Sequence, residues 1–135
     1  EVSINNQSHS SINQGVVIFI GIEASDNLKE VIKMKDKIFN FSILEDDSST
    51  MSASLKNLKE DIMIISQFTL AAITSKGTKP SFHRSAKPEY AKLMYHAFVS
   101  EFKKEQNIVV DGVFGEHMDI TLTNKGPITL NFEVN

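Results

Sequence analysis

The pattern of apolar and polar positions predicts strands alternating with two helices. Residues 15–22 form a continuous β-branched and aromatic run, which is typical of a strand buried on both faces. A second apolar run covers residues 61–70. Between these runs, apolar residues recur every three or four positions, which predicts an amphipathic helix over residues 26–40. Either Ser25 or Asp26 stands where its N-cap is expected.

A second helix is expected to begin at Pro88, because proline suits the first helical position. The polar start of the chain predicts a short hairpin that turns at Asn5 and Asn6. The remaining expected strands are short and cover residues 41–44, 108–113, 118–123 and 128–134.

The resulting order of elements is β, β, α, β, β, α, β, β, β. It predicts an α/β fold in which residues 1–135 form a single domain. We expect a mixed, largely antiparallel sheet, curved or closed into a partial barrel, with the two helices packed on one face. The three final strands follow one another through short turns, so they are expected to pair in antiparallel fashion.

Composition narrows the possible functions. The chain has 135 residues and no cysteine, which excludes disulfides, thiolate metal sites and thiol nucleophiles and fits a reducing cytosol. A net charge of −3 argues against a general nucleic-acid binder. No apolar run reaches the length of about 18 residues that a membrane helix needs.

One group of candidate residues lies where the second apolar run becomes polar, at Ser66, Gln67 and Thr69. Ligands of α/β sheets often bind where strands end in this way. On a continuing strand, Ser66 and Phe68 would share one face. The alternative is a strand end whose polar groups are satisfied by turn hydrogen bonds.

Charge is distributed unevenly along the chain. Residues 74–104 carry seven of the 14 basic side chains and two of the 17 acidic ones. This basic segment follows the Ser66–Thr69 strand end and would suit a ligand with a phosphate group. The alternative is a solvated loop and helix face.

The histidines give no motif with metal-ligand spacing. His117 and Asp119 share one side of an expected strand, where they either hold a cation or form a solvated edge. His83 lies in the basic loop and is a weaker ligand candidate, whereas His96 is expected on the helix surface. No nucleophile elbow, phosphate-binding glycine loop or dinucleotide motif occurs.

Four segments together resemble the D-aminoacyl-tRNA deacylases. They are Ser66-Gln-Phe-Thr-Leu70, Lys76-Gly-Thr-Lys-Pro-Ser-Phe82, Val113-Phe-Gly115 with Met118, and Asn124-Lys-Gly-Pro-Ile-Thr129. They occur in the order seen in that family, and the resemblance runs from about Val2 to the end. Each segment alone is a weak signal, but four in register are specific.

The resemblance implies a cytoplasmic homodimeric ester hydrolase that uses no metal and no cofactor. Its substrate would be a D-amino acid, or glycine, esterified to the 3′-terminal adenosine of tRNA, and its role chiral proofreading in translation. The residues that the resemblance assigns are Ser66, Gln67, Phe68 and Thr69 for catalysis in one subunit, Gly126, Pro127, Ile128 and Thr129 of the other subunit for chiral selection, and Phe114, Met118, Lys76 and Lys79 for contact with the adenosine and the tRNA.

The family's Gly-Pro bond is cis, so Gly126-Pro127 is expected to be cis. Its main-chain carbonyls would face the substrate's α-carbon, where an L side chain clashes and a D side chain points away. For the chemical step, Thr69 is one candidate nucleophile, although no adjacent base is evident. We favour assistance by the ribose 2′-hydroxyl, with the N–H groups of Phe68 and Thr69 stabilising the oxyanion.

The sequence also departs from the family. The family has a further strand, carrying Gln-Arg-Val, before the position of Val2, so we expect that this sequence is incomplete at its start. Ser42 stands where arginine is usual, and Lys125 stands where aspartate often occurs. Two other functions stay open: a non-catalytic module that binds nucleic acid or protein on the same fold, and a general small-molecule hydrolase.

Overall fold

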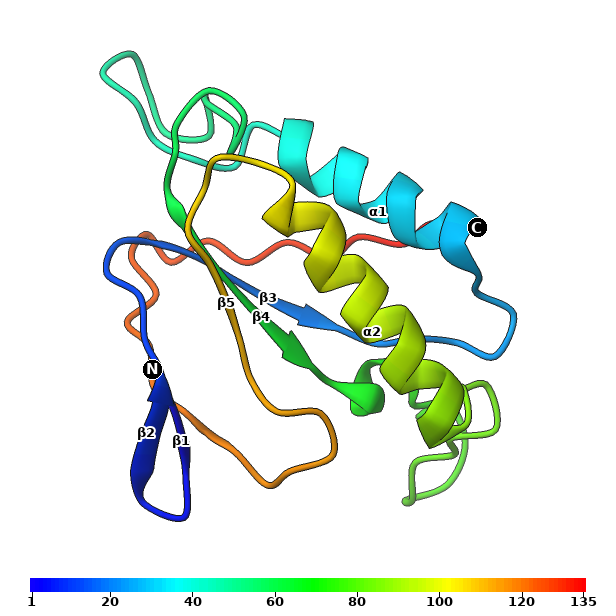
Figure 1. Cartoon of the computed structure of the whole chain (residues 1–135). Coiled ribbons are helices and arrows are strands. Elements are labelled where there is room, and N and C mark those ends of the chain that lie inside the picture. Colours follow the sequence, from blue (N-terminus) through cyan, green and yellow to red (C-terminus); the bar gives the residue numbers. More distant parts are fainter.

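The computed structural model describes all 135 residues and contains two three-stranded sheets and two α-helices (Figure 1). The strands are β1 (Val2–Ile4), β2 (Gln7–Ser10), β3 (Gly15–Ile20), β4 (Asp61–Ser66), β5 (Val109–Asp111) and β6 (Asp119–Ile120). The helices are α1 (Leu28–Asn40), the short 3₁₀ helix η1 (Phe68–Ala71) and α2 (Pro88–Lys103).

The larger sheet has the order β3-β4-β5, and all its strands are parallel. Its central strand, β4, is buried on both faces, and its side chains alternate between two clusters. Ile62 and Ile64 pack in the main core with both helices, whereas Met63 and Ile65 pack on the opposite face with Val2. Because successive side chains of β4 point to opposite faces of the sheet, this strand contributes to both apolar clusters.

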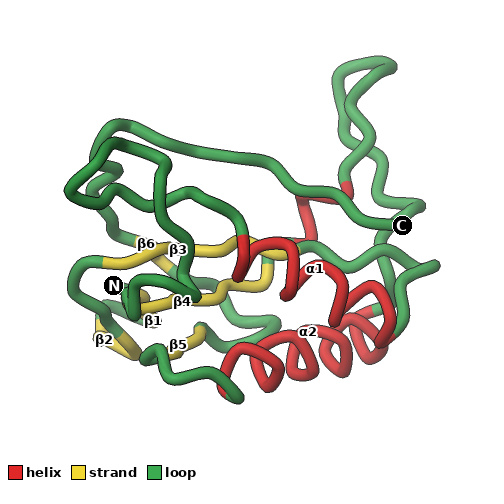
Figure 2. Tube along the Cα trace, turned by 90° about the horizontal axis from the view of Figure 1, so that it is seen from above, coloured by secondary structure: helices red, strands yellow, loops and turns green.

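The two helices begin with different local signals. Asn27 caps α1: its side chain accepts from the Lys29 amide at 2.8 Å, and Glu30 accepts from the Asn27 amide at 2.8 Å, which forms a capping box. Pro88 is the first residue of α2, as the sequence predicts. The helices pack side by side (Figure 2). Neither is long and apolar enough to cross a membrane.

The smaller sheet has the order β2-β1-β6 and is antiparallel. Asn5 and Asn6 form the predicted hairpin turn with φ values of 52° and 63°, a conformation that asparagine tolerates well. The two pairings of β1 differ in range, because Val2 faces Ser10 of the same hairpin on one side and the distant Ile120 on the other. The start of the chain thereby fixes the segment that follows β5.

The α/β class and the two helices are confirmed, but the sheet prediction needs correction. Instead of one largely antiparallel sheet, there are an all-parallel sheet and a separate antiparallel one, and neither closes into a barrel. The cause is α2, which carries the chain back so that β5 runs parallel to β4. Strand β3 lies at a sheet edge with Phe19 39% exposed, so its predicted burial on both faces is wrong.

Several predicted boundaries also differ. The N-cap of α1 is Asn27 rather than Ser25 or Asp26. Residues 41–44 contribute only one bridge, between Leu44 and Ala53, and residues 128–134 form no strand within this chain. The run 61–70 is a strand only as far as Ser66.

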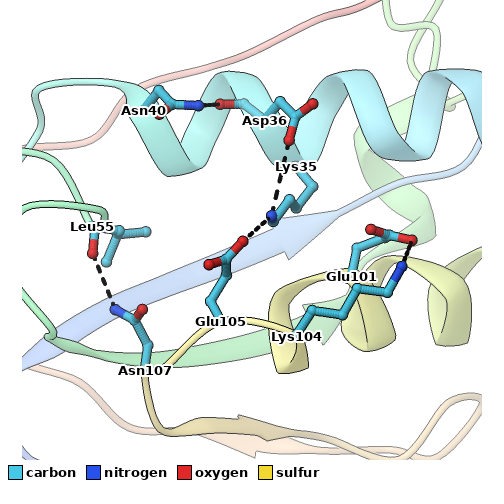
Figure 3. Close-up of polar contacts among 8 residues, drawn as sticks. All are labelled: Lys35, Asp36, Asn40, Leu55, Glu101, Lys104, Glu105 and Asn107. Atoms are coloured by element: carbon cyan, nitrogen blue, oxygen red, sulfur yellow. Dashed lines mark hydrogen bonds and ion pairs between the residues drawn. The ribbon is translucent and has the colours of Figure 1, made fainter.

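Polar contacts join the loop after α2 to the middle of α1 and to the loop that enters β4 (Figure 3). The Lys35 ammonium donates to Glu105 at 2.6 Å, and Lys35 is only 7% exposed. The Asn107 amide donates to the carbonyls of Leu55 at 3.3 Å and Glu60 at 2.9 Å. The Lys35–Glu105 pair thus holds the loop after α2 against α1, and the Asn107 bonds hold it against the loop that enters β4.

Candidate active site

The polar end of β4 is where the chain leaves the sheet. Ser66 is the last strand residue and lies opposite Ile20 on β3, and the Gln67 amide donates to the Ile20 carbonyl at 2.8 Å. The chain then turns into η1. The predicted strand alternation of Ser66 with Phe68 is therefore wrong, because Phe68 already belongs to a helical turn.

The start of η1 leaves backbone donors without helical partners. Its first hydrogen bond runs from the Leu70 amide to the Gln67 carbonyl at 3.2 Å. The N–H groups of Phe68 and Thr69 precede that bond, so no carbonyl within the helix receives them. Two adjacent amide donors thus follow the carboxyl end of the central strand.

Thr69 has one side-chain partner, and it is a donor. The Gln67 side-chain nitrogen donates to the Thr69 hydroxyl oxygen at 2.5 Å. No histidine or carboxylate forms a hydrogen bond with this hydroxyl. The NH2 group of a neutral carboxamide donates and is not a base, so this contact orients Thr69 without activating it as a nucleophile.

The basic loop is attached to this strand end through an aromatic contact. Phe68 is 59% exposed and packs on Phe82, with ring centroids 5.1 Å apart. Two backbone hydrogen bonds between Ile73 and Ser81, of 2.8 and 3.0 Å, close the loop into a small hairpin. Its exposed Lys76 and Lys79 therefore project from a hairpin that contacts the site. His83 contacts Ser81 at 3.0 Å.

Phe114 and Met118 lie after β5. Because β5 runs parallel to β4, the carboxyl ends of the two strands lie at the same end of the sheet. The Gly112 amide donates to the Ile64 carbonyl at 3.2 Å. Met118 covers Gly112 so closely that a Cβ there would lie 2.6 Å from its sulfur. Phe114 is half-buried and packs on Tyr95, with ring centroids 5.9 Å apart. The two residues assigned to the adenosine thus flank one loop.

The Gly126-Pro127 peptide bond is cis, as the resemblance implies. The Asn124 side chain holds this loop, because it accepts from the Ile128 amide at 3.0 Å and donates to the Thr129 hydroxyl at 2.9 Å. Gly126 has φ +126°, a conformation that other residues rarely adopt. The loop lies across the molecule from η1 in Figure 1, so one chain does not bring the two motifs together.

Sequence reasoning missed a group of charged residues beside Phe114. A cavity of about 340 Å³ there is lined by His9, Lys92, His96, Asp111, Gly112, Val113 and Phe114. His96, expected on the plain helix surface, borders this cavity. Only the fold brings β2, α2 and β5 together, so no spacing in the sequence indicates it.

Tyr95, behind the same cavity, is structural. Its hydroxyl donates to the Ile64 carbonyl at 2.8 Å, and its side chain is fully buried. Burial, and to a smaller extent the negative charge of Asp111, raise the pKa of Tyr95 well above its ordinary value. Elsewhere, no three His, Asp or Glu side chains converge as a metal site, so the shared cation considered for His117 and Asp119 finds no third ligand.

Comparison with known proteins decides the family. The family model described as D-Tyr-tRNA(Tyr) deacylase matches residues 1–133. The chain belongs to the D-Tyr-tRNA(Tyr) deacylase family. A D-aminoacyl-tRNA deacylase of Francisella tularensis subsp. novicida (strain U112) is 39% identical over 133 residues, covering 98% of this chain and 92% of that protein. A D-aminoacyl-tRNA deacylase of Pseudoalteromonas translucida (strain TAC 125) is 40% identical over 134 residues, covering 99% and 92%.

A solved structure agrees with the D-Tyr-tRNA(Tyr) deacylase assignment in fold. It is the structure named "c-Myc DNA Unwinding Element Binding Protein", which matches with a TM-score of 0.93 at 33% identity and covers 99% of this chain and 91% of that one. The whole fold, including both sheets, is therefore that of a known structure. The name of that protein states binding to a DNA element, which is a different kind of activity.

Proposed function

We propose that this chain hydrolyses the ester bond of D-aminoacyl-tRNA and releases the free D-amino acid and tRNA. The single observation that carries the proposal is the match of the D-Tyr-tRNA(Tyr) deacylase family to residues 1–133. The geometry supports it, because Ser66, Gln67, Phe68 and Thr69 lie at the carboxyl end of β4 beside the basic hairpin. We place this activity in the cytoplasm, in quality control of translation.

The reaction we propose uses backbone donors rather than an activated side chain. Water adds to the ester carbonyl carbon, with the neighbouring ribose 2′-hydroxyl assisting. The negative oxygen that forms accepts from the free N–H groups of Phe68 and Thr69. The bond from the carbonyl carbon to the ribose 3′-oxygen then breaks, the 3′-oxygen takes one proton of water, and the carboxyl group keeps the water oxygen.

Three measurements separate this mechanism from nucleophilic attack by Thr69. Thr69→Ala keeps near-full kcat in the proposed mechanism, because the Thr69 amide remains. Phe68→Pro removes one N–H at a position where proline is tolerated, and its kcat falls about 100-fold or more below that of Phe68→Ala, which loses the same ring but keeps the N–H. Substrate ending in 2′-deoxyadenosine reacts poorly. Normal turnover of that substrate, or inactivity of Thr69→Ala, contradicts the mechanism.

We propose that the complete site needs two copies of the chain. The segment after β6 that carries the Gly-Pro loop lies away from η1 within one chain, although the resemblance places both motifs at one substrate (Figure 1). Residues 121–135 form no regular element, so much of their backbone lacks a pairing partner within the chain. Large apolar side chains are also exposed at Phe68, Leu70, Leu122 and Leu130. A symmetric homodimer would cover these groups.

In the dimer, the partner's main chain would decide handedness. The carbonyls of Gly126 and Pro127, followed by Ile128 and Thr129, would form a wall at the substrate's α-carbon. An L side chain points into that wall, a D side chain points away, and glycine passes. Asn124 supports this role, because its two side-chain hydrogen bonds hold the loop in one shape.

The direct test compares tRNA charged with D-tyrosine and tRNA charged with L-tyrosine, using the chain at equal concentration. The proposal expects the D ester to be hydrolysed and the L ester to stay intact. Hydrolysis of both at equal rates removes the chiral proposal. Equal activity on free D-amino-acid esters and on charged tRNA would indicate a general hydrolase instead.

A second candidate function is a nucleic-acid-binding module without catalysis. The similar structure at TM-score 0.93 favours it, because that protein is named for binding a DNA element. Lys76 and Lys79 on the exposed hairpin would serve either function. Tight binding of nucleic acid with no release of D-tyrosine from tRNA would select this candidate.

A further inference from the structure

The cavity beside Phe114 and the proposed catalytic site lie at the same end of the parallel sheet. Strands β4 and β5 run parallel, and Ile64 lies opposite Asp111. The carboxyl ends of both strands therefore lie at the same end of the sheet. The Ser10 hydroxyl donates to the Asp111 carbonyl at 2.9 Å, which attaches β2 to the end of β5. The cavity of about 340 Å³ therefore opens one strand away from the Ser66–Thr69 segment.

The ionisable groups around this cavity have no partners in the chain. The side chains of His9, Lys92, His96 and Asp111 form no hydrogen bond or ion pair with one another or with any other residue. Lys92 and His96 are one helical turn apart on the exposed face of α2, so they face the cavity together. Unpaired charges around a cavity favour a ligand that supplies the partners.

We propose that this cavity binds the nucleotide that precedes the terminal adenosine of tRNA. This inference rests on the proposed function. Lys92, with His96 and His9 beside it, faces the phosphate. Val113 and Phe114 form an apolar wall for the base of this nucleotide, because nucleobases stack on aromatic side chains. Phe114, which the resemblance assigns to the adenosine, would then contact both nucleotides, with Met118 on the adenosine side alone.

Asp111 determines which ligand fits. A carboxylate repels a free phosphate, so the cavity does not suit a purely anionic ligand. Asp111 accepts from a hydrogen-bond donor, and the exocyclic amine of cytosine is such a donor. Because tRNA ends in cytidine followed by adenosine, a cytidine beside the adenosine supplies both the phosphate and the amine.

Binding of short nucleotides tests this inference without catalysis. The probes are adenosine, the dinucleotide cytidylyl-adenosine and the dinucleotide uridylyl-adenosine, each titrated against the whole protein. Cytidylyl-adenosine is expected to bind about tenfold more tightly than adenosine and several-fold more tightly than uridylyl-adenosine. Equal affinity for adenosine and cytidylyl-adenosine overturns the inference. Equal affinity for the two dinucleotides contradicts the proposed hydrogen bond between Asp111 and the amine of cytosine.

Lys92→Ala should abolish most of the gain from adenosine to cytidylyl-adenosine. It should also lower the dependence of log affinity on log salt concentration by about one. Lys103→Ala is the matched control, because Lys103 is an exposed, unpaired lysine at the other end of α2. Identical behaviour of the two variants contradicts the inference.

Kinetics separate this inference from the proposed function. The substrates are D-tyrosyl-tRNA and the 3′ ester of D-tyrosine with adenosine alone. Lys92→Ala is expected to raise KM about tenfold more for the tRNA than for the adenosine ester. Equal changes with both substrates overturn the inference while leaving the function standing, whereas wild-type protein that hydrolyses neither substrate removes the function itself.

Discussion

Two cavities of equal size, about 340 Å³ each, differ in how their charged groups are used. In the cavity at the start of β4, Lys35 is bound to Glu105 at 2.6 Å, and its ammonium lies 4.8 Å from the centre of the Phe39 ring. In the cavity at the end of β5, the side chains of Lys92 and Asp111 have no partner. The nearly buried lysine of the first cavity is paired within the chain, whereas Lys56 and Lys59, which also line that cavity, are not. In the second cavity, no ionisable side chain is paired, so all of them are available to a ligand.

This difference shows why charge alone is a poor guide to function. A buried lysine is costly unless it is paired, so the pairing of Lys35 follows from folding and needs no ligand. Exposed lysines cost little, so the position of Lys92 is free to serve binding. The contrast predicts that variants at the two cavities affect different measurements.

The largest effect on stability is expected at the first cavity. Glu105→Ala removes the partner of Lys35 and leaves a nearly buried ammonium, so the free energy of unfolding falls by about 2 kcal/mol. Lys35→Met should cost less, because the Glu105 side chain is 32% exposed and stays hydrated. Urea unfolding measures both variants. A smaller loss for Glu105→Ala than for Lys35→Met contradicts this account of the pair.

The matched prediction at the second cavity is a near absence of effect on stability. Lys92→Ala should change the free energy of unfolding by less than about 0.5 kcal/mol, because the exposed ammonium has no partner in the chain. The same urea titration tests it. A loss as large as that of Glu105→Ala would mean that both cavities are structural.

Tyr95 tests whether a residue that touches the wall of the second cavity is still structural. Tyr95→Phe removes the 2.8 Å hydrogen bond to the Ile64 carbonyl, which keeps its bond from the Gly112 amide, and should cost about 1 kcal/mol of unfolding free energy. Because the pKa of Tyr95 is raised in the folded state, the unfolded chain loses its proton first as the pH rises.

The stability of the wild type should therefore fall above a pH of about 10, the ordinary tyrosine value, by at most about 1.4 kcal/mol per pH unit from this group. Thermal unfolding between pH 8 and 11 measures this slope. The same slope in Tyr95→Phe would show that other groups cause it.

The smallest effect concerns Asp46, a partly exposed carboxylate that is hydrogen-bonded by serines. Asp46 accepts from the Ser48 hydroxyl and amide at 2.5 and 2.8 Å and from the Ser52 hydroxyl at 2.6 Å. The Ser48 hydroxyl contributes most to holding the pKa of Asp46 well below its ordinary value. The stabilisation that ionised Asp46 gives to the folded state is therefore present above the unfolded-state pKa. It is lost as the pH falls through the folded-state pKa.

Asp46→Asn should speed hydrogen exchange in residues 45–52 without moving the global melting temperature. Hydrogen exchange at neutral pH, resolved by segment, checks this expectation. A change spread over β4 would contradict a purely local role.

The sequence predicted those parts of the fold that depend on local pattern. Residues close together in sequence determine the apolar periodicity of α1, the start of α2 at Pro88 and the Asn5-Asn6 turn. The pairing of β5 with β4 depends on the path of α2, and the pairing of β6 with β1 joins residues far apart in sequence. Alternation and turn signals therefore could not decide between one antiparallel sheet and two sheets.

The candidate site divides in the same way. Contiguous motifs such as Ser66–Thr69 and Gly126-Pro127 were visible in the sequence. The cavity formed by His9, Lys92 and Asp111 was not, because its residues come from three elements that only the fold brings together. The free N–H groups of Phe68 and Thr69 were proposed as donors, but the 3₁₀ turn that frees them was expected to be strand.

The proposal of a site shared between two copies is tested most directly by co-expressing two damaged chains. Phe68→Pro removes a donor at η1, and Gly126→Val places a branched side chain where φ is +126° and a Cβ would lie 2.8 Å from the Ile128 side chain. Each variant alone should fail to hydrolyse D-tyrosyl-tRNA. Co-expressed in equal amounts, they should recover about a quarter of wild-type activity, because half of the dimers then contain one intact site. Activity no higher than that of the separate variants would contradict the shared site.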